Sequence, residues 1–250
     1  MKTRIEWNAW GRVDPLYGVA AWEGKSKGGS SPWKDDEFYA LGKSDWRDFK
    51  RHWDHFGVRY GTCVEIGCGA GRITRQLAEE FNQVKALDVS EAMIAYARSR
   101  IPNGNVEFIL ADGIRLPFSD RSVDAVFSTH VFQHFDSLED AHGYFNEIFR
   151  VMNDHGSLLI HLPVYRWPGC GKIHRLIHAV RGAGSELRAA FDRSLIRRGL
   201  WRPLMRHLPF EIGWLFGTLD SLGFTDAEIR IIRVKSNNGE HPFVLARKRG

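Results

Sequence analysis

The sequence has few cysteines and lacks any long apolar stretch. Its cysteines are Cys63, Cys68 and Cys170, an odd number without a C-x-x-C pair, which favours a reduced protein. No run of about 18 apolar residues is present, so no transmembrane helix is expected. The start of the chain, MKTRIEWNAW, lacks the apolar core of a secretion signal. Together these absences predict a cytoplasmic protein in which Cys63 and Cys68 are small core residues.

Acidic residues are scarce in one segment only. Residues 166–207 hold ten Lys or Arg residues and two acidic ones, a net charge of +8. The whole chain carries +5, so the remainder is net −3. A length of 250 residues suits one α/β domain with additions. The basic character therefore belongs to one segment and not to the fold.

Residues 62–74, TCVEIGCGAGRIT, combine a strand pattern, a glycine turn and the start of a helical pattern. Three glycines alternate with other residues at positions 67, 69 and 71. Glycine lets backbone N–H groups approach a ligand, because no Cβ blocks the way and positive φ is accessible. The segment predicts a cofactor loop, although an ordinary strand–helix turn is the alternative for the loop taken alone.

Two common nucleotide motifs are missing from this loop. A dinucleotide fingerprint, G-x-G-x-x-G, needs a third glycine where Arg72 stands, and that glycine permits close helix–strand packing. A phosphate-binding Walker A loop needs Gly-Lys-Ser/Thr, which is absent. The loop is therefore expected to hold a different cofactor.

The next segment, residues 84–98, predicts a second strand that ends in an acidic residue. Asp88 at this strand end is placed to accept both hydroxyls of a ribose, since a carboxylate has two acceptor oxygens. Ser90 is a candidate helix cap, and Met93 begins an apolar stripe behind it. A local turn or cap role for Asp88 is the alternative, and nicotinamide-binding folds use the same device.

Two further strands follow in order. Residues 106–118, VEFILADGIRLPF, predict a strand closed by Asp112-Gly113, which read alone is also a plain Asp-Gly turn. Residues 123–128, VDAVFS, predict another strand, which runs into THVFQHF at 129–135. The carboxyl ends of parallel strands meet at one edge of a sheet. The four motifs are therefore expected to share a single crevice.

The spacing E-x-G-x-G-x-G and the order of these motifs resemble class I S-adenosylmethionine-dependent methyltransferases of the small-molecule branch, over residues 60–165. The resemblance implies an α/β fold with a Rossmann-like seven-stranded sheet, mostly parallel, whose last strand is antiparallel, with helices on both faces. It implies that S-adenosylmethionine is the cofactor, with the Asp112 carboxylate on its adenine amino group. The implied cofactor-binding residues are Glu65, Gly67, Cys68, Gly69, Gly71, Asp88, Val89, Met93, Asp112, Gly113 and Thr129.

The chain divides into four expected parts. Residues 1–59 form an N-terminal cap with six of the nine tryptophans, residues 60–165 the cofactor-binding core, residues 166–208 a basic helical insertion or lid, and residues 209–250 the last helix and a β-hairpin. The hairpin is expected because Asn-Gly favours a tight turn.

Within these parts, helices are predicted over 35–56, 137–152 and 210–222, and strands over 157–164, 228–235 and 242–248. The aromatic stripe of helix 35–56 indicates packing on the sheet. The alternative comes from a resemblance of D-P-L-Y and E-F-Y-A-L-G to a leader of some bacterial methyltransferases, in which the helix at 38–42 covers the cofactor.

Histidines after the fourth strand are the candidate catalytic residues. His134 is the first choice for a general base and His130 the second, and they face one way if the segment is helical. A capping or buried, hydrogen-bonded role is the alternative for each. His161, near the end of the fifth strand, is a further candidate for the pocket wall. No metal site is predicted, because no third ligand with zinc-like spacing accompanies the pair.

Several classes of methyl acceptor are not expected, because their sequence signatures are missing. The sequence lacks the Asn/Asp-Pro-Pro-Tyr/Phe run of base-amine methylation, a nucleophilic cysteine after the fourth strand, and the double-glutamate loop of arginine methylation. We therefore expect methyl transfer to O or N of a small or sugar-like metabolite, which the basic segment allows to be anionic. Alternatives for that segment are RNA phosphates, as in an RNA-directed methyltransferase, an anionic membrane surface, or a solvated lid face. A non-catalytic S-adenosylmethionine-binding protein is a further alternative, and a nicotinamide enzyme a distant one.

Overall fold

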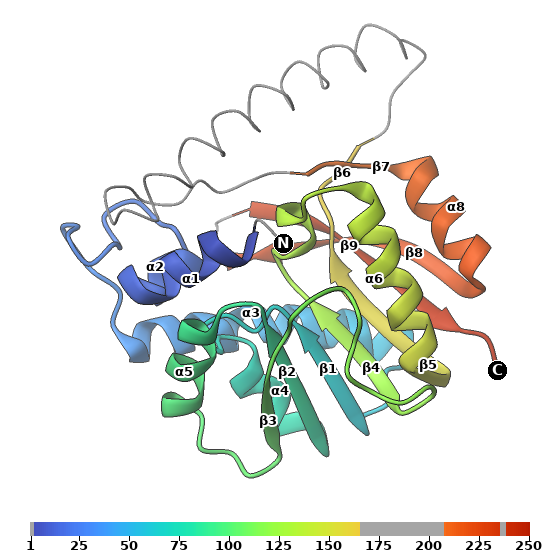
Figure 1. Ribbon diagram of the computed structural model, residues 1–250, viewed down its shortest axis with the longest axis horizontal. Helices are drawn as coiled ribbons and strands as arrows, with labels where there is room; N and C mark the ends of the chain where they lie inside the picture. Colours follow the sequence, from blue (N-terminus) through green and yellow to red (C-terminus); the bar gives the residue numbers. More distant parts are fainter. Residues whose placement is uncertain (1–2, 166–207, 236–238) are drawn as a thin grey trace, which may run out of the picture.

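The computed structural model describes residues 3–165, 208–235 and 239–250 (Figure 1). The predicted helices of the basic insertion lie outside these residues, as do positions 236–238 of the predicted hairpin turn. No helix in the described part of the chain is long and apolar enough to span a bilayer.

A seven-stranded sheet forms the centre of the molecule, with the strand order β3-β2-β1-β4-β5-β9-β8. Its strands are β1 (Thr62–Ile66), β2 (Gln83–Asp88), β3 (Val106–Leu110), β4 (Val123–Ser128), β5 (Met152–His161), β8 (Phe224–Val234) and β9 (Gly239–Lys248). Every neighbouring pair is parallel except those that involve β9, which runs antiparallel to both β5 and β8. The predicted Rossmann-like class with an antiparallel last strand is confirmed.

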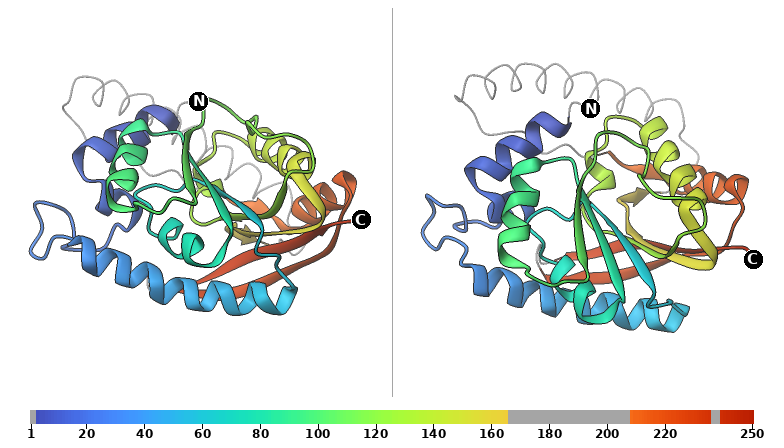
Figure 2. Two further views of the ribbon diagram at one scale, coloured as in Figure 1. Left: turned by 90° about the horizontal axis from the view of Figure 1, so that it is seen from below. Right: turned by 60° about the horizontal axis from the view of Figure 1, so that its bottom comes forward.

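Helices cover both faces of this sheet (Figure 2). They are α1 (Thr3–Val13), α2 (Pro15–Val19), α3 (Asp35–Phe56), α4 (Thr74–Glu80), α5 (Glu91–Arg100), α6 (Leu138–Val151) and α8 (Ile212–Leu222). Apolar side chains of α3 and α4 share one core cluster with the sheet, and those of α6 and α8 share another on the opposite face. Burial of both faces explains why the inner strands are mostly apolar, as in β1 with Cys63, Val64 and Ile66.

The aromatic stripe of α3 packs on the sheet. Phe49 and Trp53 are fully buried and lie against Phe127 of β4, with ring centroids 5.5 Å and 6.0 Å away. Trp53 Nε1 also donates a 2.9 Å hydrogen bond to Ser157 Oγ on β5. Of the two expectations for this helix, packing on the sheet is confirmed.

The carboxyl ends of the first strands are covered by α1 and α2 instead. These helices lie beside α5 (Figure 1) and share a core cluster with it through Trp10, Leu16 and Met93. Asp14 caps α2 by accepting a 3.2 Å hydrogen bond from Tyr17 N, and Pro15 occupies the first turn. Residues 38–42 are not part of the pocket wall: Tyr39 Oη donates a 2.8 Å hydrogen bond to Ala70 O in the glycine loop, and Gly42 lies against Arg72.

The fifth strand and the last helix differ from their predicted bounds. β5 begins at Met152 and ends at His161, because Pro163 has no N–H to continue the ladder. The chain then forms β6 (Val164–Tyr165), which pairs with β7 (Phe210–Glu211). The first two residues of the predicted helix 210–222 are therefore strand, and Glu211 caps α8 by accepting from Trp214 N at 2.8 Å.

Candidate functional site

A pocket lies where the strand order reverses, beyond the carboxyl ends of β1, β2 and β4 and beneath the segment that contains α1 and α2. This is the expected place for a ligand in an open α/β sheet. Seven of the predicted cofactor residues line it: Glu65, Gly67, Cys68, Gly69, Asp88, Val89 and Thr129. Motifs that are far apart in the sequence thus reach one crevice.

The glycine loop forms the floor of the pocket in a conformation that requires glycine. Gly67 has φ +76° and Gly69 has φ +53°, values at which a side chain is strained. A Cβ on Gly67 would lie 2.2 Å from a methyl carbon of Val131. The N–H groups of Gly67 and Cys68 both donate to Leu87 O at 2.8 Å, which joins the loop to the end of β2.

Asp88 is held rigidly at the end of β2. Its Oδ2 accepts a 2.8 Å hydrogen bond from Gly69 N, and its Oδ1 accepts one of the same length from Ser90 N. Each carboxylate oxygen has a second lone pair, so the group can still accept two hydroxyls from a ligand. Burial raises the pKa of Asp88 to about 6, against the lowering effect of these amide donors.

Glu65, the penultimate residue of β1, is a second buried carboxylate at this end. It is 3% exposed, and its Oε2 accepts a 2.6 Å hydrogen bond from Thr74 Oγ1. Burial raises its pKa to about 7, the charge of Asp88 adds to the shift, and Arg72 and the Thr74 bond oppose it. A cation in the pocket would stabilise both ionised carboxylates.

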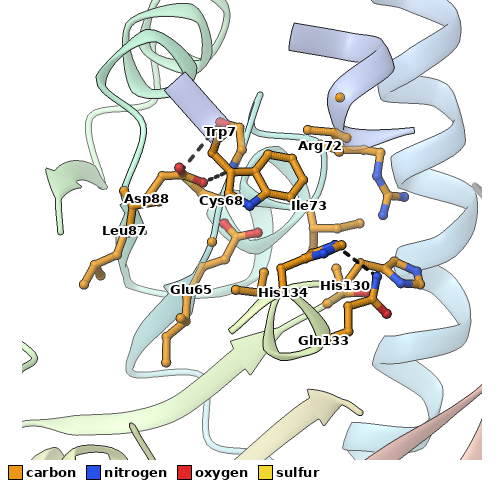
Figure 3. A pocket seen from close by; sticks show the side chains of 18 of the residues that line it. Trp7, Glu65, Cys68, Arg72, Ile73, Leu87, Asp88, His130, Gln133 and His134 are labelled. Atoms are coloured by element: carbon orange, nitrogen blue, oxygen red, sulfur yellow. Dashed lines mark hydrogen bonds between the residues drawn. The ribbon is translucent and has the colours of Figure 1, made fainter. Parts of the chain in front are cut away.

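The other end of the pocket carries imidazoles and the Arg72 guanidinium (Figure 3). His134 is 7% exposed, its Nε2 lies 3.1 Å from Gln133 Nε2, and the edge of the Trp7 ring is packed against it at a centroid distance of 5.1 Å. Burial lowers the pKa of His130 well below its usual value, and the charges of neighbouring groups, led by His161, lower it further. His130 is therefore neutral at pH 7.

The two histidines do not share a helical face. His130 has a left-handed backbone (φ +58°), and His134 ends a single 3₁₀ turn, η1 (Phe132–His134). The helical segment that would make the two histidines face one way is therefore not formed, although both side chains line the pocket. Instead, His130 faces His161 at the end of β5 and His241 on β9, at centroid distances of 4.3 Å and 5.0 Å.

Four predicted cofactor residues lie outside the pocket wall. Gly71 is next to Ile101 and Ala97 behind the loop, and Met93 is fully buried in the cluster shared by α1, α2 and α5. Asp112 is exposed, while Gly113 accepts a hydrogen bond from Tyr144 Oη at 3.2 Å. β3 is the edge strand, so the turn after it lies farther from the crevice than the ends of β1 and β2.

Several residues of the pocket wall were not predicted. Trp7 and Val19 come from the helical cover, and Arg72 and Tyr144 come from the end of the glycine loop and from α6. The aromatic-rich leader was the available signal for the first two, but its path over the pocket depends on tertiary packing. Tyr144 belongs to the apolar stripe of its helix and is indistinguishable there from a core residue.

Part of the chain is similar to known methyltransferases. Residues 64–160 match the family described as methyltransferase domain. The chain is 33% identical over 103 residues to phosphoethanolamine N-methyltransferase 2 of Caenorhabditis elegans, 36% over 100 residues to a probable S-adenosylmethionine-dependent methyltransferase of Mycobacterium tuberculosis, and 33% over 123 residues to a quinone C-methyltransferase of Pseudomonas fluorescens. These matches cover 40%, 40% and 44% of this chain, and 23%, 35% and 47% of the relatives, so the chain spans less than half the length of each.

Solved structures show the same fold. One is the methyltransferase complexed with the Trm112 methyltransferase activator of Haloferax volcanii, with 16% identity, a TM-score of 0.61 and coverage of 98% of both chains. Another is phosphoethanolamine N-methyltransferase 2 of Haemonchus contortus with phosphomonomethylethanolamine and S-adenosylhomocysteine, with 18% identity, a TM-score of 0.59, and coverage of 99% of this chain and 58% of the other.

Proposed function

Residues 64–160 are a class I S-adenosylmethionine-dependent methyltransferase domain, and on this premise we propose that the chain transfers a methyl group to an oxygen or nitrogen atom of a small metabolite. The observation that carries the proposal is the polarity of the pocket. Two buried carboxylates lie at one end and the His134 imidazole at the other. One end suits a cationic cofactor with a ribose, and the other suits an acceptor that must lose a proton.

The residues at the carboxylate end fit S-adenosylmethionine. Asp88 would accept the ribose hydroxyls, Glu65 would add negative charge near the cofactor cation, and Gly67 and Gly69 keep the floor free of side chains that would fill it. The cofactor supplies a methyl group on a sulfonium, which is already a good leaving group. The protein would mainly align the two reactants and exclude water. Trp7 and Val19 from the segment over the pocket would help to exclude water.

At the opposite end His134 would accept the acceptor's proton. Neutral imidazole is the form that does so, and a hydrogen bond from the Gln133 amide to Nε2 would place the ring proton on Nδ1. The acceptor hydroxyl or amine would replace that amide as the partner of Nε2. His134 would therefore raise the rate of methyl transfer and leave cofactor affinity largely unchanged.

The relatives and the charge of the chain support this class of acceptor. Proteins similar to this chain are named for phosphoethanolamine, sterol and quinone methylation, all of them small molecules. The net charge of +8 in residues 166–207 favours an anionic acceptor, such as a phosphorylated sugar. Leu208, next to that segment, donates a 2.6 Å hydrogen bond from its N–H to Gln133 O, beside the proposed base.

The test is to incubate the full chain with methyl-labelled S-adenosylmethionine and metabolite extracts and to detect labelled products by mass spectrometry. We expect a labelled small molecule that Asp88→Ala abolishes and that Asp36→Ala, an exposed matched control on α3, leaves in place. Cofactor binding without any labelled product from broad extracts would contradict methyl transfer and support a non-catalytic role.

A further inference from the structure

Three histidines meet beside the acceptor end of the pocket. His130 follows β4, His161 is the last residue of β5, and His241 is near the start of β9. β4 and β5 are parallel and β9 is antiparallel to β5, so the carboxyl ends of two strands and the amino end of the third share one edge. The topology therefore brings together side chains that lie 31 and 80 residues apart in the sequence.

The geometry of this cluster is close to that of a metal site. One ring nitrogen from each histidine lies within 4.8 Å of the other two. Tetrahedral coordination at ordinary Zn–N lengths places ligand nitrogens about 3.3 Å apart. Rotation of the side chains can bring the three nitrogens to this separation. His161 is 1% exposed, and the left-handed backbone of His130 is the kind of strain that collects at functional sites.

The surrounding charges are compatible with a cation. Arg72, whose charge acts on His130, is paired with the buried Asp45 carboxylate on α3. Asp45 also acts electrostatically on His241. His241 Nε2 is buried and has no hydrogen-bond partner among the described residues. Neither described cysteine belongs to the cluster.

We propose that His130, His161 and His241 bind one divalent transition metal ion. Imidazole suits zinc, iron, nickel and copper, and three protein ligands leave a further position for water or for an exogenous oxygen or nitrogen. Because His130 also lines the pocket, the metal would lie next to the acceptor end. The assignment does not depend on the proposed methyl transfer, since the metal is measured directly.

The experiment uses untagged, metal-free full-length protein titrated with Zn²⁺ by calorimetry, with bound metal counted by mass spectrometry. One ion per chain is expected. His161→Ala and His241→Ala should each weaken binding at least ~100-fold, whereas His55→Ala on the exposed end of α3 should not. The double variant His174→Ala/His178→Ala should also retain the metal, which separates this cluster from the other histidine pair of the sequence.

A second, spectroscopic measurement distinguishes loss of the metal site from misfolding of the variants. Co²⁺ bound to the wild-type protein should give a ligand-field spectrum of nitrogen and oxygen donors, without a thiolate charge-transfer band. His161→Gln and His241→Gln, verified as folded by circular dichroism, should lose that spectrum. Absence of stoichiometric Zn²⁺, binding that survives both cluster variants, or binding lost in the His174/His178 variant would overturn the proposal. Proton-linked binding of inorganic phosphate with no affinity for Zn²⁺ would overturn it as well.

Discussion

The substitution Glu65→Gln tests the electrostatics of the pocket floor. Gln has nearly the same volume, and its carbonyl oxygen still accepts from Thr74 Oγ1, so packing and the hydrogen bond are retained. The negative charge is lost. Glu65 has a pKa of about 7 in the folded protein against the ordinary value of 4.5, so its ionisation opposes folding.

The sign and size of the effect follow from that shift. Because the folded-state pKa is raised, the contribution to stability is fully present below pH 4.5 and is lost as the pH rises through 7. At about 1.4 kcal/mol per pKa unit, the wild-type protein should lose about 2–3 kcal/mol relative to Glu65→Gln between pH 5 and pH 8.5. Asp88 titrates in both proteins, so most of its contribution cancels in the difference.

Urea unfolding of both proteins without cofactor at the two pH values measures this difference. The exposed Glu79→Gln on α4 is the matched control and should show no pH-dependent gain. Wild-type affinity for S-adenosylmethionine should also rise with pH through 7, because the bound cation favours the carboxylate, and should be flatter in Glu65→Gln. A stability difference that is the same at both pH values would refute the assigned burial of this charge.

Three further predictions concern the loop, the base and the core. Gly67→Ala should destabilise the protein by about 1–2 kcal/mol through its positive φ alone, and the clash of the new Cβ with Val131 should add to that loss. In the double variant with Val131→Ala, thermal unfolding should show that the clash is relieved and that the loss from the positive φ remains. His134→Ala should lower the rate of methyl transfer at least ~100-fold with little change in calorimetric cofactor affinity; an undiminished rate would exclude it as the base. Trp53→Phe should cost about 1–3 kcal/mol in urea unfolding, because Ser157 Oγ loses its buried donor, and a neutral result would contradict the importance of that bond.

The sequence predicts best what is determined by neighbouring residues. The glycine loop and the Asp88 strand end are local motifs, and the structure places both on the pocket. Ser90 accepts from Met93 N at 3.2 Å as a helix cap, as expected from its type and position. The fold class follows from the order of such motifs, because parallel strands joined by helices have few possible arrangements.

The parts that could not be predicted depend on long-range packing. Nothing near His241 in the sequence indicates His130, and only the antiparallel β9 brings them together. The path of α1 and α2 over the pocket depends on contacts with α5, far along the chain. Asp112 fits the family motif in sequence, yet its exposed position after the edge strand keeps it off the pocket wall.

Calorimetric titration of the full chain with S-adenosylmethionine, and separately with a reduced nicotinamide dinucleotide, measures the cofactor assignment directly. We expect one S-adenosylmethionine per chain, binding that Asp88→Ala weakens severely and the exposed control Asp36→Ala does not, and no binding of the dinucleotide. Binding of the dinucleotide in place of S-adenosylmethionine, or S-adenosylmethionine binding that is indifferent to Asp88→Ala, would contradict the account.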